Sequence, residues 1–439
     1  MKPITSSTLK QLEKNFQEKP VQQALKRVLY STDILTAIQK QERMPANQFM
    51  FSHEIKTLPV ANQKQSGRCW IFAGLNVLRE VIVKKYNMSQ FEFSQNYTAF
   101  YDKLEKINYF IESIDDFLEV DQDDRTLQHL LRTGIQDGGQ WDMFVSLIDK
   151  YGVVPQSYMT ETVSSSKTPP MNQIINLKLR QYAAHARKLH QQGQALDALK
   201  AQTLDELYTF LVTCFGEPPT MLHFSYVDKE GTFREIKDLT PQSFYKEAVG
   251  IDLHDYVSMI NAPTKDKPYL KSYTVSYLGN VIGGKPIKYL NVDMATLTSL
   301  VIKQLADQEV VWFGSDVKRY GDRVQGIWDS LYYDDALLGM RMTMSKEDQL
   351  DYAESLMTHA MVITGVHIEQ GQPKRFKIEN SWGEASGQKG YYLASIEWFD
   401  QFVYQAVIHK KHLSETQLDA FNEAPTVLKP WDPMGALAD

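Results

Sequence analysis

Cysteine is scarce in this chain. Only Cys69 and Cys214 occur among 439 residues, whereas a secreted chain of this length would usually carry structural disulfides. The two thiols favour a reducing compartment, and the charged start of the chain has no apolar segment typical of a signal peptide. Apolar runs of about 18 residues are also missing, so no membrane span is expected. We therefore expect a cytoplasmic location.

Blocks of positive charge are missing as well. No run of five or more Lys or Arg residues occurs, and the net charge is −7. This balance argues against nucleic acid as a partner. The histidines outside the C-terminal third show no paired metal-ligand spacing, and the glycine-rich segment 279–284 lacks the Lys-Ser/Thr of a phosphate-binding loop. We expect no metal and no cofactor.

The first 160 residues have the periodicity of helices. Residues 7–42 predict one or two amphipathic helices. The run that starts at Cys69 is apolar on nearly all sides and predicts a buried helix that ends near Tyr86, with Ser66 as its N-cap. Ser94 opens a further predicted helix, and another follows Trp141.

The character of the chain changes after residue 160. Residues 161–220 contain a Ser/Thr/Pro stretch and then a helical, Gln-rich segment, and 221–237 predict a hairpin. From Val310 onward strands dominate, at 310–313, 360–366, 375–378 and 390–393. Their spacing predicts an antiparallel sheet or half-barrel. The tail from Leu428 has two prolines and is not expected to be a helix.

Three separated residues form the parts of a cysteine-nucleophile site. Cys69 opens the buried helix, His359 precedes a strand, and Asn380 follows another strand. The thiolate is the reactive form of Cys, and both a helix N-terminus and an imidazolium favour it. Asn380 can orient the His359 ring through its amide, and Trp382 can cover that hydrogen bond.

Two further elements serve the rest of the reaction. The side-chain amide of Gln63, with the backbone N–H of Cys69, can form an oxyanion hole. Gly138 and Gly139 would expose bare backbone with which a substrate strand can pair. Each piece alone has an ordinary structural explanation, such as a buried thiol or a turn. Their shared order and spacing favour catalysis, whereas Cys214 is expected to be at least partly buried and inert.

These motifs resemble the papain-like cysteine peptidases, and within them the bleomycin hydrolase/aminopeptidase C branch. The general match rests on Gln63, Cys69-Trp70, Asp137-Gly138-Gly139, His359-Ala360 and Asn380-Ser381-Trp382-Gly383. The match to the branch rests on Gln65-Ser66-Gly67-Arg68-Cys69-Trp70, Gly138-Gly139-Gln140-Trp141 and the ending Pro430-Trp431-Asp432-Pro433-Met434-Gly435-Ala436-Leu437. Arg68 replaces the usual small residue before the nucleophile. The separation of 290 residues between Cys69 and His359 exceeds the about 130–150 usual for papain-type enzymes.

The resemblance implies an α+β fold of two subdomains with the cleft between them. Residues 55–160 would form a helical subdomain that carries Cys69, and 291–410 a β half-barrel that carries His359 and Asn380. Residues 1–54 would pack on this core as a helical segment. Residues 161–290 would be an insertion that makes oligomer contacts, and 411–439 a helix followed by a tail that enters the cleft.

The resemblance also implies a function. We expect a thiol aminopeptidase that releases N-terminal residues from peptides through a Cys-acyl intermediate and assembles as a homohexamer. The tail, through Ala438 and Asp439, would hold the free N-terminus of the substrate, while Gly138, Gly139 and Trp382 bind the peptide. Two alternatives stay open: an endopeptidase of the same fold, and a barrel that binds nucleic acid or peptide.

Overall fold

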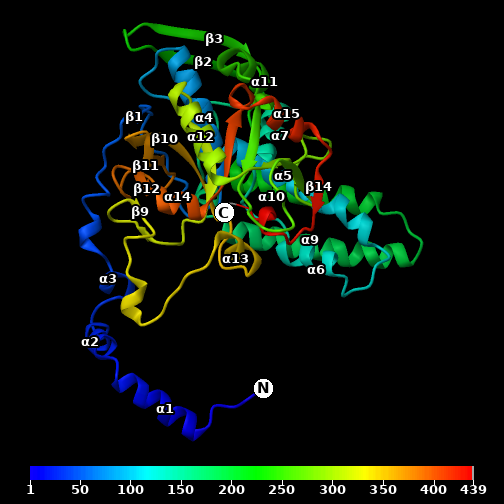
Figure 1. The fold of residues 1–439 in the computed structure, drawn as a ribbon. Helices are drawn as coiled ribbons and strands as arrows, with labels where there is room; N and C mark the ends of the chain where they lie inside the picture. The colour runs from blue at the N-terminus through cyan, green and yellow to red at the C-terminus, as the bar shows by residue number, and fades with distance from the viewer. Residues whose placement is uncertain (438–439) are drawn as a thin grey trace.

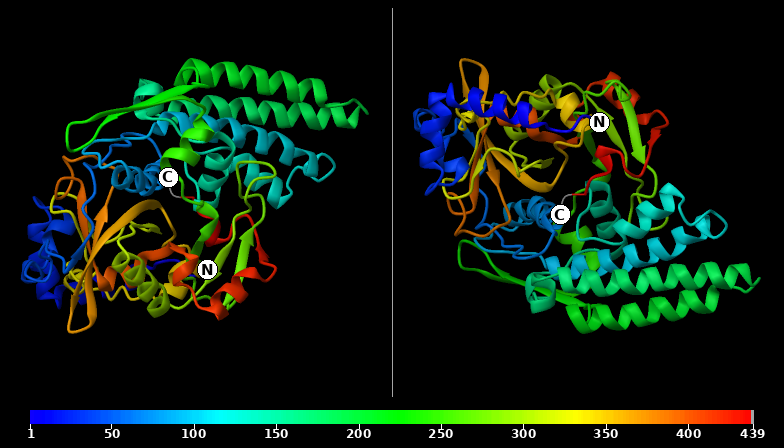
Figure 2. Two further views of the ribbon diagram at one scale, coloured as in Figure 1. Left: turned by 90° about the horizontal axis from the view of Figure 1, so that it is seen from above. Right: turned by 90° about the horizontal axis from the view of Figure 1, so that it is seen from below.

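The computed structural model describes residues 1–437. Its long helices group on one side and its main sheet on the other (Figures 1 and 2). This division matches the expected α+β class. Among the described residues no helix is both long and apolar enough to cross a membrane.

The sheet half is one extended sheet. Its strands in the described residues are β1 (His53–Glu54), β4 (Tyr256–Ile260), β5 (Lys271–Val275), β6 (Tyr289–Asn291), β7 (Val311–Ser315), β8 (Gly321–Asp322), β9 (Ile327–Trp328), β10 (His359–Glu369), β11 (Gln372–Glu379), β12 (Tyr391–Ser395), β13 (Val403–His409) and β14 (Thr426–Leu428). The order is β14-β5-β6-β4-β13-β7-β10-β11-β12-β9-β8, with β1 paired to β10. At the antiparallel centre His359 of β10 pairs with Ser315 of β7.

The four strands predicted after Val310 are confirmed as β7, β10, β11 and β12. The expected boundary at residue 290 is wrong, because β4, β5 and β6 already belong to the main sheet. β4 is buried along its whole length, and its short apolar run of five residues gives no periodicity that would separate it from a helix. The insertion therefore ends before Tyr256.

The helical half is built around α4 (Cys69–Lys85), as its apolar sequence predicts. Thirteen of its side chains are buried, from Cys69 to Val83. The predicted N-cap is wrong: Arg68 occupies that position without a side-chain cap, and the Ser66 hydroxyl donates instead to the carbonyl of Gln63 at 2.7 Å. Ser94 does cap the next helix, α5 (Gln95–Ser113).

The remaining helices surround these two halves. Beside α4 and α5 lie α6 (Arg125–Thr133), α7 (Trp141–Tyr151), the short α8 (Val163–Ser166) and the long pair α9 (Pro169–Gln191) and α10 (Asp197–Phe215). The predicted hairpin is formed by β2 (Leu222–Val227) and β3 (Phe233–Leu239), which α11 (Pro241–Phe244) follows. The sheet half carries α12 (Met294–Ala306), α13 (Lys346–Asp351), α14 (Ile396–Phe402) and α15 (Glu415–Asn422).

The N-terminal segment only partly packs on the core. α1 (Ser6–Gln17), α2 (Pro20–Val28) and α3 (Ile34–Ala37) contain no buried residue, and α1 and α2 extend away from the body in Figure 1. Packing begins at Ile38, which is buried with Tyr332 and Tyr333. The expectation that residues 1–54 lie on the catalytic core is therefore wrong for α1 and α2.

Candidate active site

Cys69 lies where the two halves of the molecule meet. It is the first residue of α4, and its side chain is fully buried. The backbone N–H of Ala360 donates a hydrogen bond to its Sγ at 3.4 Å. Because Ala360 directly follows His359 at the start of β10, this contact brings the thiol to the strand that carries the imidazole.

The hydrogen bonds around Asn380 fix the tautomer of His359. Nε2 of His359 lies 2.8 Å from Oδ1 of Asn380, and the backbone N–H of Ser381 donates to the same Oδ1 at 2.7 Å. Since a backbone N–H can only donate, the shared atom must be the amide oxygen. Nε2 of the neutral ring therefore carries the hydrogen, and Nδ1 keeps the lone pair that can accept a proton.

The environment of His359 keeps its ring neutral. Burial lowers the pKa of His359 to about 4, although the hydrogen bond to Asn380 opposes this shift; the positive charge of Arg323 adds to the lowering. A neutral imidazole with a free Nδ1 lone pair is a base at neutral pH. The ring can thus take the proton of a thiol.

Trp382 covers the imidazole, as the sequence suggests. Its ring centroid lies 5.0 Å from that of His359, with the planes tilted by 32°. Arg323 in turn lies over Trp382, with its guanidinium carbon 4.3 Å from the ring centroid. His359 and Asn380 are both buried beneath this cover, so their hydrogen bond is shielded from water.

Gln63 is held in one orientation beside the loop that precedes Cys69. Its Oε1 accepts the hydroxyl of Ser381, and its Nε2 donates to the carbonyl of Ser66 at 2.6 Å. The backbone N–H of Gln63 also donates to the carbonyl of Ser381 at 2.8 Å. A side-chain amide has two N–H bonds. Ser66 uses one, so the second can be directed at a developing oxyanion.

The two glycines differ from expectation. Gly138 and Gly139 are both buried rather than exposed. A Cβ on Gly139 would lie 2.4 Å from Cε2 of Trp70, so this position requires glycine for packing. The carbonyl of Gly138 accepts a hydrogen bond from Lys106 Nζ at 2.7 Å. In the described chain these residues fix the wall of the site instead of offering a bare strand.

Asp137 anchors that wall. Its carboxylate pairs with Lys103 at 2.6 Å and accepts the backbone N–H of Gly67 at 2.8 Å, two residues before the nucleophile. Burial acts to raise the pKa of Asp137, but Lys103 and the hydrogen bonds from Thr168 and Asn172 overcome it, so the pKa lies well below its ordinary value. The ionised carboxylate thus holds the loop that presents Cys69.

Arg68 makes buried contacts that the sequence did not reveal. The side chain is only 2% exposed, and it makes a bidentate pair with Glu161 at 3.0 and 2.9 Å. Its Nε also donates to the hydroxyl of Ser66 at 2.9 Å. Arg68 therefore links the Gln63–Ser66 loop to Glu161 at the start of the insertion. An arginine directly before an apolar helix was the only signal for it.

A buried ion pair joins the two halves behind the site. Arg79 Nη2 and Asn76 Nδ2, both on α4, donate to Glu379 Oε1 at 2.8 and 2.9 Å. Glu379 directly precedes Asn380 on the other half of the molecule. The polar residues inside an otherwise apolar helix are the sequence feature that could have indicated this link.

The C-terminal tail follows an ordered path toward the site. β14 pairs in parallel with β5, Asp432 pairs with Lys267 at 2.9 Å, and the guanidinium carbon of Arg125 lies 3.9 Å from the Trp431 ring centroid. The carbonyl of Ala436 accepts a hydrogen bond at 2.7 Å from Nε2 of Gln140, the residue that follows Gly139. Ala438 and Asp439, predicted to bind substrate, lie outside the described residues.

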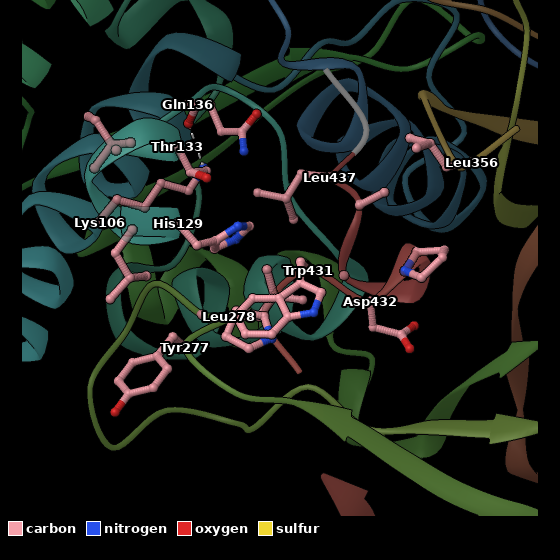
Figure 3. A pocket seen from close by; sticks show the side chains of 18 of the residues that line it. Lys106, His129, Thr133, Gln136, Tyr277, Leu278, Leu356, Trp431, Asp432 and Leu437 are labelled. Atoms are coloured by element: carbon pink, nitrogen blue, oxygen red, sulfur yellow. Dashed lines mark hydrogen bonds between the residues drawn. The ribbon is translucent and has the colours of Figure 1, made fainter. Parts of the chain in front are cut away.

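Two cavities adjoin this region. The tail lines one of about 480 Å³, and Figure 3 shows Trp431 and Leu437 directed into it near His129 and Leu278. The other, of about 1090 Å³, is a cleft whose lining includes Gln63, Asp137, His359 and Trp382. Thr133, Ile135 and Gln136 line both cavities. The cavity lined by the tail therefore adjoins the cleft that contains the imidazole.

Within residues 1–437 no group of three or more His, Cys, Asp or Glu side chains is arranged to hold a metal ion. Cys214 is partly buried, and burial raises the pKa of its thiol.

Comparison with known proteins gives the family. Residues 3–435 match the model of the Peptidase C1-like family. The aminopeptidase C of Listeria monocytogenes is 45% identical over 99% of both chains, and the bleomycin hydrolase of Gallus gallus is 39% identical over 89% of both. The crystal structure of PepW from Lactobacillus rhamnosis is 48% identical, covers 99% of both chains and superposes with a TM-score of 0.98.

The chain belongs to the Peptidase C1-like family. Its full-length similarity to the aminopeptidases C further makes it a cysteine aminopeptidase.

Proposed function

We propose that the chain removes N-terminal residues from peptides with Cys69 as nucleophile and His359 as base. Nδ1 of His359 takes the thiol proton as Sγ attacks the scissile carbonyl. The same nitrogen then gives its proton to the leaving amine when the carbon–nitrogen bond breaks, which leaves a thioester on Cys69. Water then loses a proton to Nδ1 and attacks the thioester, the carbon–sulfur bond breaks to release the amino acid, and Nδ1 returns the proton to the Cys69 sulfur.

The oxyanion is stabilised by amide donors. Gln63 directs its second Nε2 hydrogen toward the carbonyl oxygen, together with the backbone N–H of Cys69 at the N-terminal end of α4. Support comes from the fixed orientation of Gln63, whose Oε1 accepts from Ser381 while Nε2 faces the loop before the nucleophile. Asn380 keeps the His359 ring in the tautomer that this cycle needs.

The tail restricts cleavage to free N-termini. The hydrogen bond from Gln140 to Ala436 is the observation on which this part of the proposal depends, because it puts the tail beside Gly139 at the wall of the site. A tail in this position blocks the binding of residues upstream of the scissile bond. Ala438 and Asp439 then meet the substrate's α-ammonium, and a charge-assisted hydrogen bond of about 1.5–3 kcal/mol favours that cation.

The test compares matched fluorogenic amides with free and acetylated N-termini. The full chain should cleave only the free form, and deletion of Ala436 to Asp439 should allow cleavage of the acetylated form. Cys69→Ser serves as the inactive control. If truncation leaves the acetylated amide uncut while the free amide is still cleaved, the role of the tail is wrong. If Cys69→Ser keeps full, iodoacetamide-sensitive activity, the nucleophile is wrong.

We also propose a cytoplasmic homohexamer. The scarcity of cysteine supports the location. Exposed apolar side chains on α1 and α2 support self-association, because Leu9, Leu12 and Val21 are each more than half exposed. Light scattering on the purified chain measures the mass of the assembly, and a monomer at micromolar concentration would contradict the hexamer.

A further inference from the structure

The cleft that contains His359 has an uneven charge. Its exposed charged side chains in the described residues are Lys64, Lys318 and Arg323. None of the three makes an ion pair with another described residue. The carboxylate of Asp137 also lines the cleft, but it is buried and paired with Lys103 at 2.6 Å. The cleft therefore presents three cations without a compensating exposed anion.

The mechanism decides which part of a substrate meets these cations. His359 must give its proton to the leaving amine, so the peptide downstream of the scissile bond passes the imidazole. Trp382 covers this imidazole with ring centroids 5.0 Å apart, and Arg323 lies over Trp382. The tail lines the adjoining cavity instead, and its Ala436 carbonyl accepts a hydrogen bond from Gln140. Arg323 consequently stands beside the downstream residues of the substrate.

Arg323 is suited to bind a carboxylate. Its guanidinium carbon lies 4.3 Å from the Trp382 ring centroid, which holds the planar group by a cation–π contact. Stacking in this way leaves the N–H edges of a guanidinium free to make bidentate hydrogen bonds with a carboxylate. Lys318 is also close to His359 along the backbone contacts. The backbone N–H of the preceding residue, Val317, donates to the hydroxyl of Thr358 at 3.4 Å, and Thr358 directly precedes His359. A second cation is thus attached to the same wall.

We propose that this cleft selects peptides with a carboxylate close downstream of the scissile bond. The inference rests on the proposed aminopeptidase function and adds the substrate class. The carboxylate belongs either to an acidic side chain or to the C-terminus of a short peptide, since both present the same group to Arg323. Neutral aminoacyl amides lack this interaction and do not report on it.

The test uses four substrates with alanine at the N-terminus. Ala-Glu-Gly amide and Ala-Gln-Gly amide differ only in a side-chain carboxylate, and Ala-Gln-Gly with a free C-terminus carries the other carboxylate. Alanyl-coumarin amide has no downstream peptide. We expect kcat/KM to be roughly three- to tenfold higher for at least one of the carboxylate peptides than for the neutral peptide, with the excess falling at high salt.

Variants assign the effect to its residue. Arg323→Gln should bring the ratio of kcat/KM for carboxylate and neutral peptides close to one, whereas Lys229→Gln, on the distant β2–β3 turn, should keep it. The carboxylate peptide with the higher kcat/KM shows whether the bound carboxylate comes from an acidic side chain or from the C-terminus. Equal values for all three peptides, with alanyl-coumarin amide still cleaved, would overturn this inference alone. Loss of the ratio in Lys229→Gln would also overturn it, and no cleavage of any substrate would overturn the proposed function as well.

Discussion

Arg79 on α4 and Glu379 on β11 form a 2.8 Å ion pair across the boundary between the two halves of the molecule. Both side chains are nearly inaccessible to solvent. One residue after Glu379, Asn380 is hydrogen-bonded to the His359 imidazole, and Cys69 lies ten residues before Arg79. The pair thus sets how the helix with the thiol sits against the strand next to Asn380.

Glu379→Gln should therefore lower both stability and activity. The substitution leaves a buried guanidinium opposite a neutral amide, and breaking a buried pair costs about 3–5 kcal/mol of unfolding free energy. We expect the lower end, about 3 kcal/mol, because Glu80 still accepts from Arg79 Nε at 3.2 Å. Urea unfolding measures the change. The double variant Arg79→Met with Glu379→Gln should recover part of it, and a single variant as stable as the wild type would contradict this account.

Gln63→Ala should reduce kcat with little change in KM. The substitution removes the N–H₂ group that we assign to the oxyanion, and loss of one such donor costs about 10²–10³ in kcat. Steady-state kinetics on a free aminoacyl amide measures the effect, with circular dichroism as the control for folding. A variant that keeps wild-type kcat would exclude Gln63 from the oxyanion hole.

The acid limb of activity should lie well below the ordinary pKa of histidine. Nδ1 of His359 must be unprotonated to accept the thiol proton, and burial lowers the pKa of His359 to about 4. kcat/KM should thus persist through pH 6.5, the ordinary pKa of a histidine, and fall as the pH drops through about 4. Arg323→Gln removes a positive charge that lowers this pKa, so the limb should move to higher pH. A limb that stays in place would contradict the influence of Arg323.

Gly139→Ala should destabilise the protein through packing. The added Cβ would lie 2.4 Å from the Trp70 ring, whose Nε1 donates to the carbonyl of Asp137 at 2.7 Å. Overpacking of this kind costs about 1–3 kcal/mol. Thermal unfolding measures the loss, and Gly279→Ala, where the nearest side-chain atom would be 3.1 Å away, is the milder control. Equal stability of both variants would contradict the packing role.

Sequence periodicity predicted the elements that have a clear apolar face. The helix from Cys69, the helix capped by Ser94 and the hairpin at β2 and β3 all follow from it. Short strands such as β6, with only three residues, and the parallel pairing of β14 with β5 depend on partners far along the chain. Local patterns carry no information about such partners.

In the candidate site, too, local sequence features were predictable and contacts between distant residues were not. Residue type and order indicated Cys69, His359 and Asn380, because each type performs a distinct step. Contacts that depend on three-dimensional packing were not visible: the burial of Gly138 and Gly139, the bidentate pair of Arg68 with Glu161, and the path of the tail past Gln140. Their partners lie far apart in the sequence, so no spacing rule connects them.

The separation of 290 positions between Cys69 and His359 has a consequence for biosynthesis. At about 5–20 residues per second, a ribosome needs about 15–60 s to add them. During that interval neither His359, which we propose as the base, nor β10, against which α4 packs, has been synthesised. The three groups to which we assign the reaction therefore exist together in a growing chain only after Asn380 has been added.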